Sequence, residues 1–162
     1  MDLERAFSLN DFGCGYGALV PVLERLGADF LYRGFDLSQP LIDSARTTLG
    51  DRPHVSFTDS IDDLDAADYT VASGAFNVKL DVSDERWRRY VESTLELLRR
   101  LSIRGYAFNM LTSYSDPDRM RADLYYGDPG YYFALCKQHA RNVALLHDYG
   151  LYEFTMIVRC DG

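Results

Sequence analysis

The sequence lacks any run of roughly eighteen apolar residues, the length that a membrane-spanning helix needs. Its opening stretch, MDLERAFSLN, contains acidic groups and no uninterrupted apolar segment before a small-residue cleavage site, which argues against a secretory signal. Internal repeats, low-complexity segments and linkers are also missing. We therefore expect a cytoplasmic protein with no membrane partner, folded as a single domain over residues 1–162, with enough apolar residues (47%) for one core.

Paired cysteines are absent as well. The three cysteines, Cys14, Cys136 and Cys160, are odd in number and have no CxxC spacing, which argues against a disulfide framework and a zinc site. The formal net charge is -8, and the basic residues are dispersed rather than gathered into a stripe. This distribution disfavours a nucleic-acid partner and leaves a neutral or cationic small molecule as the expected ligand, with no metal.

Strand and helix patterns alternate along the chain. The expected strands cover residues 7–11, 30–36, 54–59, 69–74, 105–111, 142–147 and 151–159, and the expected helices cover 18–27, 38–50, 83–101 and 131–141. Ser38 is the expected cap of the second helix, and residues 112–130 form a long loop. Repeated strand–crossover–strand units predict an α/β fold: a Rossmann-like three-layer sandwich around a mostly parallel seven-stranded sheet, with an antiparallel C-terminal strand from a terminal hairpin.

The stretch DFGCGYG, residues 11–17, follows the first strand directly and carries glycine at every second position. In an open α/β sheet the ligand lies beyond the carboxyl ends of the strands, where the first loop presents backbone N–H groups. Gly13, Gly15 and Gly17 would allow the backbone to turn tightly and to approach a ligand closely. A glycine-rich turn that only joins a strand to a helix is the alternative.

Two acidic residues strengthen the ligand interpretation. Asp36 ends the second strand, from which a carboxylate can accept hydrogen bonds from the hydroxyl groups of a ribose. Asp59 ends the third strand, with Ser60 beside it, and could accept a hydrogen bond from an adenine amino group. As an isolated residue, Asp59 could equally be an ordinary turn residue.

In this order and spacing, the segments DFGCGYG, GFDLS and SFTDS resemble the ligand-binding segments of the class I S-adenosylmethionine-dependent methyltransferases. The resemblance implies S-adenosylmethionine as cofactor. Its binding residues would be Asp11, Gly13, Cys14, Gly15 and Gly17 in the loop, Asp36 at the ribose with Leu37 against adenine, Asp59 and Ser60 at the adenine edge, and Ser73 and Gly74 after the fourth strand. The expected activity is methyl transfer to an oxygen or nitrogen of a small-molecule acceptor.

Two alternatives stay open. A dinucleotide-binding loop has the pattern GxGxxG/A, and Ala18 occupies its last position here, so the loop alone does not exclude that function. Members of the resembling subgroup carry further upstream residues that form helices over the cofactor, and this chain begins almost at its first strand. A truncated, non-catalytic interaction module is therefore the second alternative, and exposed apolar surface could drive homo-oligomerisation.

The acceptor site is expected at the carboxyl ends of the later strands. Phe76 and Asn77 follow the fourth strand, and the segment 112–133 is a candidate substrate lid with six aromatic residues, among them Tyr114, Tyr125 and Tyr126. His147 ends the sixth strand on the same edge as the glycine loop. It is the candidate general base, oriented by Asp148, because histidine titrates near neutral pH. A structural role for His147 is the alternative.

Overall fold

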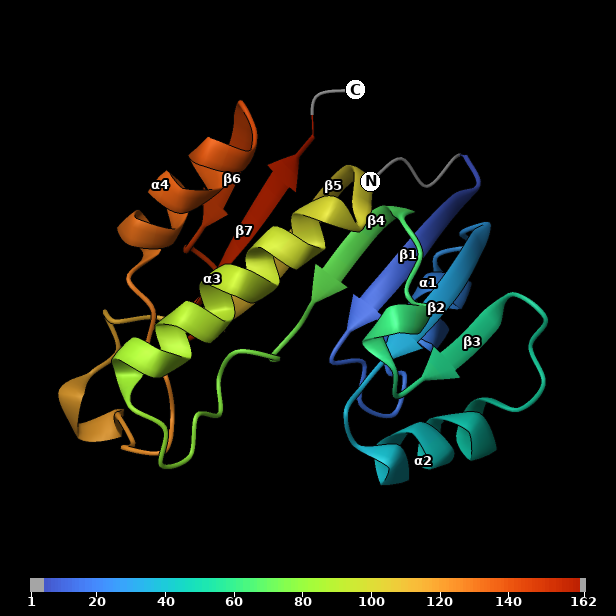
Figure 1. The fold of residues 1–162 in the computed structure, drawn as a ribbon, viewed down its shortest axis with the longest axis horizontal. Helices are drawn as coiled ribbons and strands as arrows, with labels where there is room; N and C mark the ends of the chain where they lie inside the picture. The colour runs from blue at the N-terminus through green and yellow to red at the C-terminus, as the bar shows by residue number, and fades with distance from the viewer. Residues whose placement is uncertain (1–4, 161–162) are drawn as a thin grey trace.

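The computed structural model of the protein describes residues 5–160 and contains a seven-stranded sheet with the order β3-β2-β1-β4-β5-β7-β6 (Figure 1). Only β7 runs against its neighbours, so the six other strands end at one edge of the sheet. This arrangement confirms the predicted α/β fold and its antiparallel C-terminal strand. The strands are β1 (Phe7–Phe12), β2 (Phe30–Phe35), β3 (Val55–Thr58), β4 (Ala67–Ala72), β5 (Ser102–Leu111), β6 (Asn142–Leu146) and β7 (Glu153–Arg159).

Helices cover both faces of the sheet. Figure 1 shows α3 in front of β5 and α4 in front of β6 and β7, while α1 lies behind β1 and β2. The helical segments are α1 (Val20–Arg25), α2 (Gln39–Leu49), α3 (Asp84–Arg100), α4 (Pro129–His139) and the short 3-10 turns η1 (Ile61–Asp63) and η2 (Pro117–Arg119). Among the described residues, no helix is long and apolar enough to cross a lipid bilayer.

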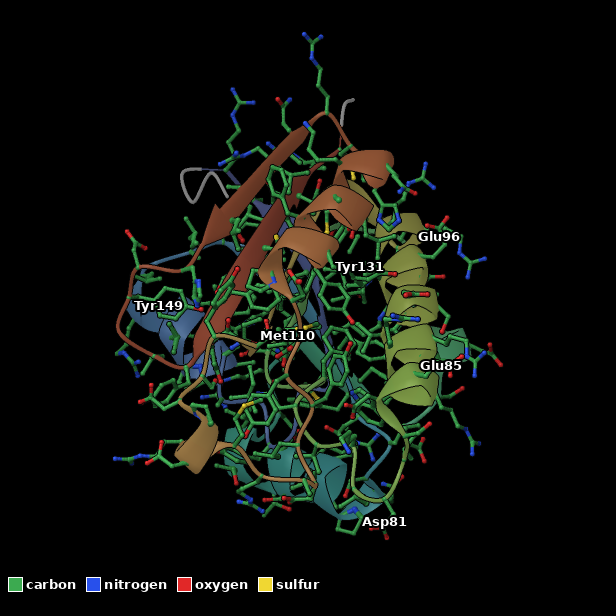
Figure 2. All side chains as sticks on the ribbon, turned by 90° about the vertical axis from the view of Figure 1, so that its left-hand side faces the viewer. Asp81, Glu85, Glu96, Met110, Tyr131 and Tyr149 are labelled. Atoms are coloured by element: carbon green, nitrogen blue, oxygen red, sulfur yellow. The ribbon has the colours of Figure 1, made fainter. Side chains whose placement is uncertain are left out.

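The sheet separates two apolar clusters. The larger one packs α3 and α4 against β4, β5 and β7, with Val91, Leu95 and Leu98 of α3 fully buried. Figure 2 shows α3 beside α4, with Met110 of β5 behind them and Tyr131 of α4 near α3. The second cluster packs α1 and α2 against β1 and β2 through residues such as Val20 and Ile42. The two clusters pack against opposite faces of the sheet and so hold its carboxyl edge in place.

The face of β4, β5 and β7 on the α1 side is less covered. A cavity of about 640 Å³ lies along it, lined by residues that include Tyr69, Val71, Ile103, Gly105 and Ile157. Within residues 5–160, no helix packs over this part of the sheet (Figure 1). On this side of the sheet, α1 and α2 thus cover β1 and β2 but leave the later strands uncovered.

The helix predicted over residues 83–101 is confirmed as α3. The Ser83 side chain accepts a hydrogen bond from the backbone N–H of Arg86, and acidic residues occupy the first turn, where they complement the helix dipole. Leu95 and Leu98 face the core, whereas Tyr90 lies at the rim with its ring tilted against that of Trp87. The apolar period of the sequence therefore placed the helix and most of its buried face.

The segment predicted as a long loop, residues 112–130, is more ordered than expected. It contains η2, forms a parallel bridge between Thr112 and Gly127, and forms an antiparallel bridge between Leu124 and Val78. A Cβ added at Gly127 would lie 2.3 Å from the sulfur of Met110, so only glycine lets the chain lie this close to the core. The predicted long loop is confirmed, since the segment contains only η2 and isolated bridges before α4 begins, and contacts with the core hold it in place.

Replacing a buried leucine of α3 tests the role of this helix in the fold. We expect Leu95→Ala to lower the free energy of unfolding by about 2–5 kcal/mol, because the side chain is fully buried and leaves a cavity. Urea unfolding followed by circular dichroism measures the change. Arg89→Ala on the exposed face should change stability by less than about 0.5 kcal/mol. Equal losses in both variants would contradict the assigned helix orientation.

Candidate functional site

The glycine loop between β1 and α1 holds all three glycines in left-handed backbone conformations. The φ angle is +76° at Gly13, +55° at Gly15 and +77° at Gly17. A Cβ added at Gly17 would lie 2.7 Å from the side chain of Leu49, whereas one at Gly15 would meet no atom within 4 Å. Gly17 therefore serves packing against α2, and Gly15 leaves the outer surface of the loop open to a ligand.

Hydrogen bonds fix this loop to the end of β2. The N–H groups of Gly13 and Cys14 donate to the carbonyl oxygen of Phe35 at 2.8 and 2.9 Å, and the N–H of Gly15 donates to Oδ2 of Asp36 at 2.9 Å. The expectation that the loop presents free N–H groups is therefore wrong at these three positions. The protein itself satisfies them, which makes the loop rigid before any ligand binds.

Asp36 is the residue that joins the loop to α2. Its Oδ1 accepts a hydrogen bond from the N–H of Ser38 at 2.9 Å while Oδ2 holds Gly15. Ser38 is the N-cap residue of α2, as predicted, but its hydroxyl makes no capping hydrogen bond. The aspartate reaches the N–H two positions ahead, as aspartates in turns often do. A carboxylate offers about four lone-pair positions, so Asp36 can still accept hydrogen bonds from a ligand.

Two neighbouring segments complete this side of the site. Leu37 follows Asp36 with 80% of its surface exposed, which gives the site an apolar contact surface. The N–H of Asp36 donates to the carbonyl oxygen of Thr58 at 3.2 Å, so Asp59 follows directly beside the end of β2. Asp59 is exposed, and Ser60 is half-buried. The structure thus brings Asp36, Leu37, Asp59 and Ser60 to one stretch of the carboxyl edge.

Asp11 and Cys14 lie beneath the loop rather than on its surface. Both are buried, and the hydroxyl of Tyr32 donates to Oδ2 of Asp11 at 2.7 Å. Burial raises the pKa of Asp11 to about 6, the Tyr32 hydrogen bond opposes this rise, and the charge of Asp36 adds to it. Burial, reinforced by Asp11, raises the pKa of the Cys14 thiol to about 12, which makes it a packing group rather than a nucleophile.

The segment after β4 lies against the glycine loop. A Cβ added at Gly13 would lie 3.0 Å from the Cβ of Ala75, so the two segments touch. Ser73 and Gly74 are exposed, and Gly74 has a φ of +73° with open space beside it. Phe76 is fully buried and packs edge-on against Phe108, so its side chain belongs to the core.

The sequence did not single out Asn109 of β5. Its Oδ1 accepts a hydrogen bond from the N–H of Gly74 at 2.7 Å, and this bond fixes the loop after β4. The signal was present, since Asn109 is the only amide in the otherwise apolar run GYAFNML. Asn77 is half-buried nearby, and its Oδ1 accepts from the N–H of Leu111 at 3.0 Å. These contacts join the ends of β4 and β5.

The three tyrosines of the expected lid occupy different surroundings. Tyr114 is 75% exposed, and its ring lies 5.9 Å from the ring of His147. Tyr125 is buried, and its hydroxyl lies 2.9 Å from that of Tyr132 in the core. The hydroxyl of Tyr126 accepts from the N–H of Arg121 at 3.0 Å. Of the three, only Tyr114 presents most of its surface to solvent.

His147 and Asp148 follow β6 and lie at the same edge of the sheet as the glycine loop. However, β6 is the outermost strand on the side of the sheet away from the loop. Three strands separate β6 from β1, which corresponds to a lateral distance of roughly 19 Å at about 4.8 Å per strand. The His147 ring contacts Tyr114 and Phe154. In the described part of the chain, His147 has no hydrogen bond to Asp148, and no group of three or more His, Cys, Asp or Glu side chains could hold a metal ion.

The buried carboxyl of Asp11 predicts a pH-dependent stability. Because its pKa is raised from 3.8 to about 6, its contribution is fully present below 3.8 and is lost as the pH rises through 6. At about 1.4 kcal/mol per pKa unit, ionised Asp11 costs up to about 3 kcal/mol at neutral pH. We expect Asp11→Asn to raise the free energy of unfolding by about 1–3 kcal/mol near pH 7.5, with little difference near pH 4.

Urea unfolding across this pH range measures the effect. Asp43→Asn, on the exposed surface of α2, is the matched control and should show no such pH-dependent gain. A loss of stability in Asp11→Asn that is the same at both pH values would contradict the assigned burial penalty.

Comparison with known proteins identifies the family. No protein-family model matches the chain. It is 49% identical over 154 residues to the Mycobacterium tuberculosis protein described as "Putative methyltransferase Rv1506c", an alignment that covers 94% of this chain and 93% of the relative. The alignment therefore spans nearly the whole length of both proteins.

Two solved structures share the fold. An O-methyltransferase family protein from Burkholderia thailandensis matches with a TM-score of 0.70 and 18% identity, over 99% of this chain and 52% of that one. Human N-acetylserotonin methyltransferase, solved in complex with S-adenosylmethionine, matches with a TM-score of 0.67 and 19% identity, over 100% and 50%. The chain thus spans about half the length of these two structures. Taken with the near full-length mycobacterial relative, the fold and the site show that this chain belongs to the class I S-adenosylmethionine-dependent methyltransferases.

Proposed function

We propose that this protein transfers the methyl group of S-adenosylmethionine to an oxygen or nitrogen atom of a small-molecule acceptor. The observation that carries the proposal is the bridge from Asp36 to Gly15 and Ser38, which fixes a carboxylate beside an open glycine surface. The Burkholderia structure is named as an O-methyltransferase family protein, and the human enzyme is named after a small molecule, N-acetylserotonin. The acidic net charge of -8 supports a small neutral or cationic acceptor rather than a nucleic acid.

The described residues fit an adenosyl cofactor. Gly15 and Gly74 both face open space and both have positive φ, so the backbone can lie directly against a ligand. Asp36 retains lone pairs for two ribose hydroxyls, exposed Leu37 offers a flat apolar contact for adenine, and Asp59 and Ser60 lie at the adjoining edge. When bound, the sulfonium of this cofactor supplies an activated methyl group.

The protein's own part in the reaction is mainly alignment. Rigid attachment of the glycine loop to β2 fixes the position of the methyl donor relative to the loop after β4, where Ser73, Gly74 and Asn77 lie. The exposed Tyr114 and His147 form the next surface along the edge and could contact the acceptor. In this proposal His147 remains the candidate base, and Asp148 its candidate orienting group, for an acceptor that loses a proton.

Removing the Asp36 carboxylate tests cofactor binding. We expect Asp36→Ala to weaken S-adenosylhomocysteine binding at least about tenfold, because it removes the acceptor of the ribose hydroxyls and releases the N–H of Gly15. Isothermal titration calorimetry measures the dissociation constant. Asp43→Ala makes the same charge change on the exposed surface of α2 and should leave the affinity within about twofold.

A preference for NADH over S-adenosylhomocysteine would overturn the proposal in favour of a dinucleotide. Unchanged affinity in Asp36→Ala would remove the residue from the cofactor site.

A further inference from the structure

Glu153, the first residue of β7, is held at the carboxyl edge by two side-chain amides. Its Oε2 accepts from Nδ2 of Asn109 at 2.7 Å, and its Oε1 accepts from Nδ2 of Asn77 at the longer distance of 3.4 Å. The three side chains come from β5, β7 and the segment after β4, so the fold alone brings them together. We call Asn77, Asn109 and Glu153 the amide–carboxylate cluster.

Backbone donors fix the orientation of both amides. A backbone N–H can only donate, so Oδ1 of Asn109 must face the N–H of Gly74 and Oδ1 of Asn77 must face the N–H of Leu111. Both amide nitrogens are therefore directed at Glu153. Two amide donors, one on each carboxylate oxygen, hold the Glu153 side chain in one position.

The part of the chain that the structure describes gives this carboxylate no cationic partner. Over residues 5–160, no Lys, Arg or His forms an ion pair with Glu153, although the side chain is half-buried. Lys79, two positions after Asn77 in the sequence, pairs with Asp84 instead. Two of the roughly four lone-pair positions of Glu153 are in use, so it can accept further hydrogen bonds from a ligand.

The cluster borders the cofactor side of the site. Asn109 lines a cavity of about 250 Å³ together with Ser73, Thr155 and Leu19, which directly precedes α1. Gly74, held by Asn109, belongs to the segment that touches Gly13 through Ala75. The cavity is smaller than the roughly 300–1,000 Å³ of sites for drug-sized ligands, so it suits a small acceptor or the reactive end of a larger one.

We propose that Glu153 is an acceptor-binding residue and that the acceptor carries an amine, whose ammonium form pairs with this carboxylate. A charge-assisted hydrogen bond would give Glu153 the cation that residues 5–160 do not provide, and the net charge of -8 favours a cationic ligand. Asn77 and Asn109 are positioning residues that hold the carboxylate. This inference rests on the proposed function, because it assigns the substrate class of the same site.

Three probes that share one ring and differ in their head group test the inference on the full chain. Binding of benzylamine, benzyl alcohol and benzoate is measured by ligand-observed NMR and calorimetry, with and without saturating S-adenosylhomocysteine. We expect benzylamine to bind at least about fivefold more tightly than benzyl alcohol, and benzoate most weakly. Absence of benzylamine binding, or tighter binding of either other probe, would overturn the inference.

Three variants assign the effect to Glu153. We expect Glu153→Gln to weaken benzylamine binding at least about tenfold and Glu153→Asp to weaken it less, since the charge is kept on a shorter side chain. Asp118→Asn removes one exposed charge from the 3-10 turn η2 and should leave benzylamine binding within about twofold. Equal benzylamine affinity in wild type and Glu153→Gln would overturn the inference.

Cofactor binding separates this inference from the proposed function. Glu153→Gln should bind S-adenosylhomocysteine within about twofold of wild type, because the glycine loop and Asp36 are untouched. Loss of both ligands in Glu153→Gln and in Glu153→Asp would show that the cluster only supports the fold, which overturns the inference. If wild type failed to bind S-adenosylhomocysteine, the proposed function would fail, and benzylamine binding without it would still test Glu153.

Discussion

The hydrogen bonds of the Asp36 carboxylate are the interaction on which the site depends. One oxygen holds the N–H of Gly15 and the other holds the N–H of Ser38, so a single side chain joins the glycine loop, the end of β2 and the start of α2. Parallel pairing of β1 and β2 in register, from Phe7 opposite Phe30 to Phe12 opposite Phe35, makes this contact possible. The site is therefore preorganised, because these contacts form within the protein and a ligand does not have to induce them.

Two carboxyl groups at the carboxyl edge of the sheet, those of Asp11 and Glu153, have different surroundings. Asp11 lies beneath the loop, where desolvation raises its pKa and the Tyr32 hydroxyl offsets part of the cost. Glu153 lies further along the same edge, where two amides donate hydrogen bonds to its carboxylate. The first carboxyl lies within the structure that supports the cofactor loop. The second is held by Asn77 and Asn109 and has no ion-pair partner among residues 5–160, which supports its proposed role in binding the acceptor.

The two faces of the sheet differ in what covers them. On one face, α3 and α4 cover β4, β5 and β7 with a fully buried aromatic and aliphatic cluster. On the other face, the same strands present Asn109 and Thr155 to a cavity near the end of the glycine loop. The period of two along a strand explains this division, because Phe108 and Met110 point to the core and Asn109 between them points to the cavity.

The sequence by itself determined the fold class, the position of helix α3 and the position of the glycine loop after β1. Apolar periodicity and the spacing of the glycines with Asp36 are local properties of the chain. It did not determine how residues 112–130 run, since the contact between Gly127 and Met110 joins segments that only packing brings together. Nor could it orient the side chains of Asn77 and Asn109 or find Glu153 between them. Only the tertiary structure decided that cluster, because its three members come from separate strand ends that meet through long-range strand pairing.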